Sequence, residues 1–304
     1  MVSPDQKLVI NPNGSLQNYY ASLESRIGYW LVLGGTRHFG YYNAGKYWPF
    51  PISASLKAME NHLYNSLGLE HGAEVLDAGC GHGYVAIYMA KRGLRVHGID
   101  VVDRHVAKAQ RNVKAAGLDR AISVRKMDFH HLDGFEDESL DGAYTMETFV
   151  HATDPETALE AFYRVLKPGG SIAFYEYDHS NLESAPIATQ RAWERINRYA
   201  AMPSNARFGQ GILQKLLADA GFVDIEVKDL TPNVMPMVRL FYLIAYIPYL
   251  IVTLLGLQAW FINTVSGVEG YRSRKYVRYV AISAKKPESK PTNVSGARTR
   301  STAP

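Results

Sequence analysis

A glycine-rich loop that begins with an aspartate is the segment whose residue types and spacing point most specifically to a bound ligand. Asp77 opens the loop, and Gly79, Gly81 and Gly83 follow at alternate positions. Glycines let the backbone adopt positive φ angles and approach a ligand closely. In the dinucleotide pattern G-x-G-x-x-G, such a loop holds a pyrophosphate at a helix N-terminus. A leading carboxylate would repel phosphate, so this loop predicts a ligand that carries an ammonium group.

Two more acids end the strands that are expected to follow. Asp100 closes a strand over residues 95–100, at the distance of ~20 residues from the loop where nucleoside-binding folds place an acceptor for ribose hydroxyls. Asp128 follows a strand over residues 122–127 and could accept from an adenine amino group while Phe129 packs on the ring. S-adenosylmethionine combines an amino acid, a ribose and an adenine without phosphate, so the three acids predict it. The alternative for each acid is an ordinary turn or cap aspartate.

The segment after the fourth predicted strand, together with the fifth strand, offers two kinds of methyl-transfer chemistry. An oxygen or nitrogen acceptor would need a general base, for which His151 is the candidate. A carbon acceptor would instead produce a carbocation, which ring faces and carboxylates stabilise. Tyr144, Tyr177, Glu147 and Glu176 are the candidates for that role. Both remain open, as do structural roles: His151 could cap the next helix, and Glu147 could order the loop or bind the cofactor amino group.

The elements that must position these residues alternate along the chain. A first strand ends at Val75 and Leu76, and further strands are expected over residues 95–100, 122–127, 140–147, 171–178, 222–230 and 276–284. Helices are expected over residues 52–67, 84–91, 155–166 and 212–220. This alternation predicts a doubly wound α/β fold, whose ligands bind beyond the C-terminal ends of the strands.

The motif series resembles that of class I S-adenosylmethionine-dependent methyltransferases over about residues 55–230. The Asp77 loop, Asp100, Asp128 and the segment Arg-Val-Leu-Lys-Pro-Gly-Gly at 164–170 carry the resemblance. The segments 144–151 and 175–177 are similar to the sterol 24-C-methyltransferase group, which includes tocopherol-type enzymes. The resemblance implies a Rossmann-like, seven-stranded, doubly wound sheet and S-adenosylmethionine as cofactor.

Roles for individual residues follow from the motifs and the resemblance. Cofactor binding is expected of Asp77, Gly79, Cys80, Gly81, Gly83, Asp100, Val101, Asp128, Phe129 and Glu147. Catalytic roles are expected of His151, Glu147 and Glu176. Substrate binding is expected of Tyr41, Tyr42, Tyr47, Trp48, Tyr144, Tyr177 and His179. The first four of these lie in an aromatic loop, residues 37–50, which is predicted to act as a lid; packing on the core is the alternative.

Five segments make up the expected domain organisation. Residues 1–54 form a helical and aromatic cap with a helix over 16–33, and residues 55–231 form the cofactor-binding core. Residues 232–274 are a hydrophobic helical insertion, 275–285 the final core strand, and 286–304 a Pro/Ser/Thr/Lys-rich disordered tail.

The insertion carries a long apolar run over residues 238–262, of borderline length for a membrane span. A single span would separate the last strand from its sheet, and Pro248 would kink the helix near its middle. We therefore expect a kinked pair of helices that forms a substrate wall or dips into one leaflet, with peripheral membrane contact through residues 235–265. A dimerisation surface or plain core is the alternative.

Composition narrows the class of partner. The 304 residues carry a net charge of +4, too small for the basic surface of a nucleic-acid binder. Cys80 is the only cysteine, so no internal disulfide forms, and the N-terminus lacks the apolar core of a signal peptide. No His/Cys cluster has metal-ligand spacing. The expectation is a cytoplasmic protein, peripherally attached to an intracellular membrane or not, without metal or nucleic acid.

Together these features predict an S-adenosylmethionine-dependent methyltransferase that acts on carbon, oxygen or nitrogen of a small lipophilic molecule, such as a terpenoid, sterol, alkaloid or polyketide. One alternative is a cofactor-binding protein of the same fold that catalyses a non-methylating rearrangement or serves as an interaction protein. Another is an NAD-dependent oxidoreductase, which the leading carboxylate of Asp77 disfavours.

Overall fold

A seven-stranded sheet with the order β3-β2-β1-β4-β5-β7-β6 forms the centre of the computed structural model, which describes residues 13–288. The strands are β1 (Glu74–Ala78), β2 (Arg95–Asp100), β3 (Ile122–Lys126), β4 (Leu140–Met146), β5 (Leu166–His179), β6 (Val223–Asp229) and β7 (Val277–Lys285). Strands β1 to β5 pair in parallel, and β7 runs antiparallel to both of its neighbours. The predicted doubly wound, seven-stranded sheet is confirmed.

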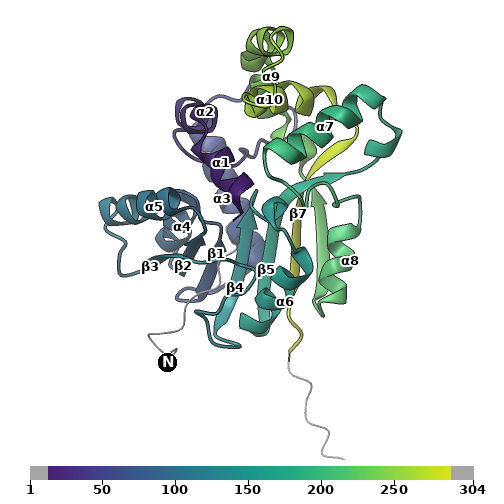
Figure 1. The fold of residues 1–304 in the computed structure, drawn as a ribbon. Coiled ribbons are helices and arrows are strands. Elements are labelled where there is room, and N and C mark those ends of the chain that lie inside the picture. Colours follow the sequence, from purple (N-terminus) through teal and green to yellow (C-terminus); the bar gives the residue numbers. More distant parts are fainter. Residues whose placement is uncertain (1–12, 289–304) are drawn as a thin grey trace, which may run out of the picture.

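Helices cover both faces of this sheet (Figure 1). One face packs against α3 (Ile52–Leu67), α4 (Tyr84–Lys91) and α5 (Asp103–Ala115), and the other against α6 (Pro155–Val165) and α8 (Ile212–Asp219). The strands are buried on both sides, as near-continuous apolar runs in parallel sheets require. Helix α6 shows how sequence sets a boundary: the Asp154 side chain accepts from the Thr157 amide at 3.0 Å, and Pro155 starts the first turn.

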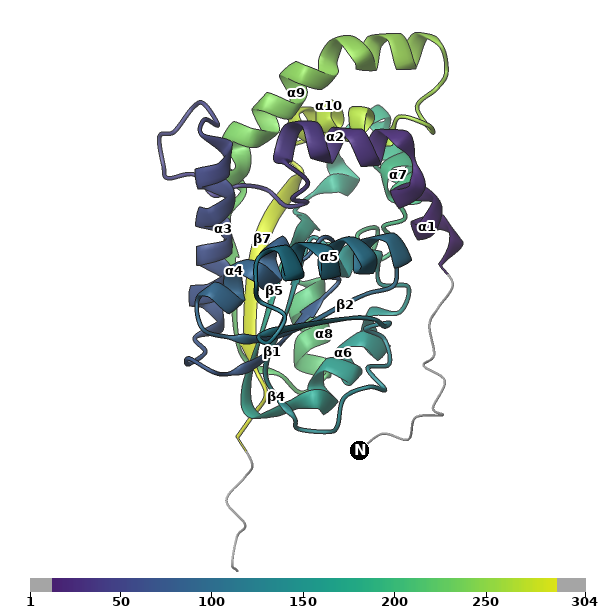
Figure 2. The same cartoon turned by 90° about the vertical axis from the view of Figure 1, so that its left-hand side faces the viewer.

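A helical cap lies over the C-terminal ends of the strands (Figures 1 and 2). It consists of α1 (Gly14–Ala21), α2 (Leu23–Leu33), α7 (Ile187–Tyr199), α9 (Thr231–Leu254) and α10 (Ile262–Arg272). The helix predicted over 16–33 is broken, because Ser22 adopts an extended backbone between α1 and α2. Helices α5 and α7 were not predicted.

The hydrophobic insertion forms the helix pair α9 and α10, which lie side by side (Figure 2). Helix α9 continues through Pro236 and Pro248, and α10 returns the chain to β7. Within residues 13–288, α9 is the one helix whose length and apolar composition would suffice to cross a membrane. Because β7 completes the sheet, both ends of the insertion lie against the same globular core.

The predicted disordered tail begins too early. Lys286 is buried: its ammonium group donates to the Leu166 carbonyl at 2.9 Å and contacts Glu138 at 3.1 Å, and its amide donates to Gly170. Burial of a lysine is sustained by such paired contacts. Residue 286 therefore belongs to the core, and residues 289–304 lie outside the described part of the chain.

Candidate functional site

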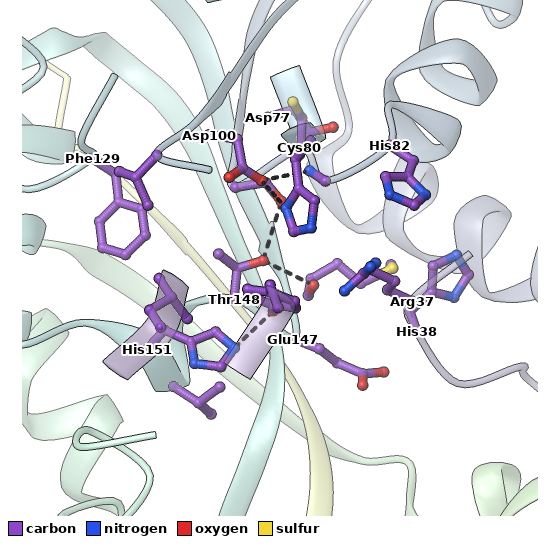
Figure 3. Close-up of a pocket in the computed structure, with 18 of the residues that line it drawn as sticks. Arg37, His38, Asp77, Cys80, His82, Asp100, Phe129, Glu147, Thr148 and His151 are labelled. Carbon is purple, nitrogen blue, oxygen red and sulfur yellow. Dashed lines mark hydrogen bonds and ion pairs between the residues drawn. The ribbon is translucent and has the colours of Figure 1, made fainter. Parts of the chain in front are cut away.

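A cavity, here called the cofactor cavity, lies beyond the C-terminal ends of β1, β2 and β4 (Figure 3). The residues from the sequence prediction that line it are Asp77, Gly79, Cys80, Gly81, Asp100, Val101, Asp128, Phe129, Glu147, Tyr177 and His151. They come from five separate segments, which meet because the carboxyl ends of parallel strands share one edge of the sheet.

Asp77, near the end of β1, lines this cavity with a buried carboxylate. Burial, reinforced by the charge of Asp100, raises the pKa of Asp77 to about 7, although the hydroxyl of Tyr144 opposes the shift. A buried carboxylate at the cavity wall fits a ligand that brings an ammonium group, because the opposite charge would stabilise the ionised form.

The glycine loop uses its glycines differently. A Cβ at Gly79, whose φ is +90°, would lie 2.0 Å from Cγ2 of Thr148, so the loop after β4 packs directly on this backbone. A Cβ at Gly81 would meet nothing closer than 3.9 Å. Gly83 does not line the cavity: it begins α4 and lets that helix approach Ala109 of α5. Its predicted contact with the cofactor is thus replaced by a packing role.

Asp100 is held in place by three donors. Its carboxylate accepts from the amides of Val102 (2.8 Å) and Gly81 (3.0 Å) and contacts Nδ1 of His105 at 3.2 Å. Burial alone would raise the pKa of Asp100, but His105 and the amide donors hold it below its usual value. The carboxylate is therefore charged and oriented, as an acceptor for ribose hydroxyls must be.

Asp128 and Phe129 form the remaining cavity wall predicted for the adenine. The Asp128 carboxylate accepts from the His130 amide at 3.0 Å, and the His130 ring stacks on Phe129 with centroids 4.8 Å apart. Nε2 of His130 accepts from the Thr153 amide at 3.1 Å. The sequence places the pair His130 and His131 near the ligand edge, and the structure shows that His130 lines the cavity and joins the loop after β3 to the loop after β4.

Glu176 orders the loop after β4 from behind and lines no part of the cofactor cavity. Its Oε1 atom accepts from the amides of Thr148 (2.9 Å) and Phe149 (2.7 Å) and from the Thr145 hydroxyl (3.0 Å). Burial raises the pKa of Glu176 to about 8. The predicted catalytic contact is therefore corrected: Glu176 does not reach the cofactor cavity, and its Oε1 atom orients the backbone of the loop after β4.

Glu147 follows β4 with a φ of +56°, an unfavourable value for a residue with a side chain. Its carboxylate accepts from the Phe39 amide at 2.7 Å, from the Tyr279 hydroxyl at 3.1 Å and from the Tyr177 hydroxyl. Burial raises the pKa of Glu147, although these donors oppose the shift. The residue thus links the segment after α2 to β5 and β7.

His151 has both ring nitrogens engaged. Nδ1 donates to the Ala201 carbonyl at 2.8 Å, and Nε2 lies 3.0 Å from the hydroxyl of Tyr20, which donates to it. Burial lowers the pKa of His151 to about 4. The ring is neutral at physiological pH, and its one basic nitrogen already accepts a hydrogen bond.

Helix α1 and the segment after α2 supply cavity residues that the sequence did not single out: Tyr19, Tyr20, Gly35, Thr36, Arg37, His38 and His82 of the glycine loop. The Arg37 guanidinium lies 4.8 Å from the centroid of the Tyr20 ring. The paired tyrosines in the predicted N-terminal helix were the available signal, since two adjacent aromatics on a short amphipathic helix often mark a covered face.

Six predicted substrate residues lie away from the cofactor cavity. Tyr144 is fully buried between the sheet and α3 and α4. His179 is buried, with Nε2 2.8 Å from the Asn205 carbonyl. Tyr41 stacks on His62, and Tyr42 donates to the Pro49 carbonyl. Tyr47 and Trp48 are more than half exposed on the outer surface. The backbone of the aromatic loop is fastened to α3 and α9 at Tyr41 and Tyr42, so these four rings lie outside the cavity, whereas Arg37 and His38 at the start of the loop line it.

A second cavity, here called the apolar chamber, lies beneath α9 and α10 and adjoins the first. The two share the side chains of Tyr19, Tyr177 and Met202. The chamber is lined by the apolar rings of Phe39, Trp193 and Phe241. On α10, its lining includes Gly267 and Gly270, which have no side chains. Within residues 13–288, no group of three or more His, Cys, Asp or Glu side chains could hold a metal ion.

Comparison with known proteins agrees with this geometry. A family model described as "Methyltransferase domain" matches residues 76–174. The S-adenosyl-L-methionine-dependent Diels-Alderase iccD of Talaromyces variabilis is 44% identical over 277 residues, which cover 90% of this chain and 95% of that protein. The sterol 24-C-methyltransferase ERG6 of Saccharomyces cerevisiae is 32% identical over 207 residues, 66% of this chain and 51% of its own length.

Among solved structures, the [4+2]-cyclase SpnF superposes with a TM-score of 0.71 at 22% identity, covering 93% of this chain and 98% of that one. The predicted resemblance to class I methyltransferases and to sterol 24-C-methyltransferases is confirmed. S-adenosylmethionine is the cofactor, and the buried carboxylate of Asp77 with the oriented Asp100 fits its amino and ribose ends. The chain belongs to the class I S-adenosylmethionine-dependent methyltransferase family.

Proposed function

We propose that this chain is an S-adenosylmethionine-dependent enzyme that catalyses a non-methylating [4+2] cycloaddition of a small lipophilic substrate. The observation that carries the proposal is the similarity to a Diels-Alderase at 44% identity along almost the whole of both chains. Of the alternatives weighed from the sequence, a non-methylating rearrangement is thus favoured over methyl transfer.

The side chains beside the cavity support the same choice. Oxygen or nitrogen methylation needs a base, yet the basic nitrogen of His151 accepts from Tyr20 and the Glu147 carboxylate accepts three hydrogen bonds. A cycloaddition joins a conjugated diene to an alkene: two σ bonds form, three π bonds are consumed and one new π bond remains. No proton moves and no group leaves, so no base is required.

The protein's contribution to such a reaction is to hold a flexible chain in its reactive fold. Positioning of this kind is worth up to ~7–11 kcal/mol in well-oriented cases. The rings of Phe39 and Phe241 in the apolar chamber would pack on a lipophilic substrate and exclude water. When bound, S-adenosylmethionine supplies a sulfonium, a fixed positive charge.

A strain that lacks the gene provides the test. Its extract should contain the linear substrate, and addition of the purified protein with S-adenosylmethionine should convert that compound to an isomer of equal mass. S-adenosylhomocysteine should not accumulate. A product heavier by one methyl group, formed together with S-adenosylhomocysteine, would overturn the proposal.

Methyl transfer is the second candidate, because the similarity to a sterol 24-C-methyltransferase covers 66% of the chain. Carbon methylation needs little basic assistance, so the engaged state of His151 weighs less against it than against transfer to oxygen or nitrogen. The mass of the product in the same assay decides between the two reactions.

We also propose that α9 rests on a membrane surface. No Asp, Glu, Lys, Arg or His occurs from residue 240 to residue 268, and the outward face of α9 exposes Leu243, Ile247, Ile251 and Leu254. Leu254 is 86% exposed and Trp260 76%. An uncharged, apolar face with a tryptophan at its edge is typical of helices that lie in a membrane interface.

Vesicles of phosphatidylcholine and phosphatidylserine should therefore float with the protein. Leu254→Glu should reduce flotation, whereas Val223→Glu on the exposed strand β6 serves as the control. A dimer in solution that dissociates on the Leu254 substitution, without flotation of the parent protein, would assign the face to a second copy instead.

A further inference from the structure

The wall between the cofactor cavity and the apolar chamber contains one polar cluster, formed by Glu147, Tyr177 and Tyr279. Tyr177 lines both cavities, Glu147 lines the cofactor cavity, and Tyr279 lines the chamber. A substrate in the chamber would thus meet this cluster at the end nearest to the cofactor.

The sheet itself builds the cluster. Tyr177 on β5 and Tyr279 on β7 are direct cross-strand partners, so their rings leave the same face of the sheet, with centroids 5.6 Å apart. Phe39 packs edge-on against both rings, and its amide donates to Glu147 at 2.7 Å. The phenols are therefore fixed by packing as well as by hydrogen bonds.

The hydrogen bonds within the cluster determine whether its phenols act as donors or acceptors toward a ligand. The hydroxyl of Tyr279 donates its one proton to Oε1 of Glu147 at 3.1 Å, and the hydroxyl of Tyr177 donates to Oε2. A phenol that has donated its proton still accepts hydrogen bonds through its oxygen lone pairs. Toward the chamber, Tyr279 consequently acts as an acceptor and not as a donor.

Asn263 of α10 offers a complementary group. It lines the chamber, and its Oδ1 accepts from the Tyr19 hydroxyl at 2.7 Å. Its buried Nδ2 has no hydrogen-bond partner within residues 13–288. An unpaired buried donor is costly, so a substrate oxygen that reached this amide would gain a hydrogen bond.

We propose that the apolar chamber is the substrate site and that Glu147, by holding the phenols of Tyr177 and Tyr279 as acceptors, selects a lipophilic molecule whose polar end carries a hydroxyl or N–H donor. An oxygen on the same molecule would accept from Asn263. The inference rests on the proposed function only in taking the substrate to be small and lipophilic. Glu147 is here a positioning residue, since it acts through the two tyrosines.

A pair of simple ligands tests the donor preference without any reaction. Dodecan-1-ol and its methyl ether share an alkyl chain and differ in one hydroxyl proton. Quenching of Trp193, which lines the chamber, or calorimetry with S-adenosylmethionine present would report binding. The alcohol should bind more tightly than the ether by roughly three- to tenfold, the range expected for one hydrogen bond.

Two variants and one control identify the cause. Tyr279→Phe should abolish the preference, because the acceptor is gone. Glu147→Gln should shift it toward the ether, because the amide would donate to one phenol and free that phenol's proton to face the chamber. Tyr249→Phe is the control: it removes another tyrosine–glutamate hydrogen bond, 2.8 Å to Glu269, outside the chamber, and should leave the preference unchanged.

Equal binding of alcohol and ether, binding of neither, or an undiminished preference in Tyr279→Phe would overturn the inference. Unchanged melting temperatures would show that the variants are folded. The cycloaddition assay is a separate readout. Failure of that assay with an intact donor preference would count against the proposed reaction alone, and the converse would count against the selecting cluster alone.

Discussion

The cofactor cavity and the apolar chamber adjoin, yet they are built in opposite ways. The acids and glycines of the cofactor cavity come from short segments at the ends of β1, β2, β3 and β4, where each place is set within a few residues, and α1 and the segment after α2 close the cavity. The chamber is formed by rings from α1, the segment after α2, β5, α7, α9 and β7, which lie far apart in sequence. Recognition of the cofactor is thus encoded locally, and recognition of the substrate by tertiary packing.

The largest effect should come from filling the glycine loop. Gly79→Ala places a Cβ 2.0 Å from Thr148 and keeps a φ of +90°, so clash and backbone strain combine. Together they cost about 2–4 kcal/mol, which should weaken S-adenosylmethionine binding by roughly 30- to 1,000-fold in calorimetry. Binding of the alkyl probes in the chamber should persist, which would confirm that the two cavities are built independently.

Gly72→Ala is the matched control for this variant. Its φ is +89°, but nothing lies within 4 Å of the added Cβ. It should lower the melting temperature through strain alone and leave cofactor affinity unchanged. Equal losses of affinity in both variants would mean that destabilisation, and not the Thr148 contact, governs binding.

The next largest effect concerns the charge of Asp77. Its pKa of about 7 means that much of the carboxyl is protonated below neutral pH, whereas the cofactor's ammonium group binds the ionised form. Affinity should therefore rise roughly fivefold between about pH 6 and pH 7, in proportion to the ionised fraction. Asp77→Asn should weaken binding and remove the pH dependence, as measured by titration at each pH. A slope that survives in the variant would place its origin elsewhere.

Substitution of Glu176 should have a smaller effect, and it should change the stability of the fold and not the affinity for the cofactor. Its pKa is raised from 4.5 to about 8, so the folded state holds the proton more tightly than the unfolded state does. Stability from this group is full below about pH 4.5 and is lost as pH rises through about 8. Glu176→Gln retains an oxygen acceptor for the Thr148 and Phe149 amides and should melt higher than the parent protein at alkaline pH, with little difference at acidic pH. The opposite order at alkaline pH would contradict the assignment.

The smallest effect should come from His151, if the reaction needs no base. His151→Asn keeps a donor for the Ala201 carbonyl, so turnover should change little and its pH profile should not shift. Loss of a general base would instead cost roughly 100- to 10,000-fold. Turnover of the isolated substrate measures the difference and separates cycloaddition from oxygen or nitrogen methylation.

The contrast between the locally encoded cofactor cavity and the apolar chamber, which depends on tertiary packing, explains what the sequence could predict. Asp77, Asp100 and Asp128 were found because each ends a strand, and parallel topology brings strand ends together without knowledge of any distant contact. Tyr144 was misassigned because it lies within β4, where both faces of a parallel sheet are buried. Tyr177, near the end of β5, emerges beside the ligand site.

Tyr279 was missed for a different reason. Its place opposite Tyr177 depends on the register between β5 and β7, and that register is set by the sheet after an insertion of two helices. The aromatic loop shows the reverse: its composition predicts ligand contacts for Tyr41 and Tyr42, but backbone hydrogen bonds of Tyr41 to Ser55 and of Tyr42 to Asn233 hold these residues against α3 and α9. Neither contact leaves a local pattern.

The place of β7 also governs the order in which the protein can be assembled. Among the strands that the structure describes, β7 comes last along the chain, yet it inserts between β5 and β6. Until residues 277–285 have been synthesised, β5 has an open edge, β6 lacks the strand with which it pairs, and the apolar helix α9 is already present. The nascent chain therefore exposes two unpaired strands and an apolar helix at once, a combination that favours aggregation and binding to chaperones.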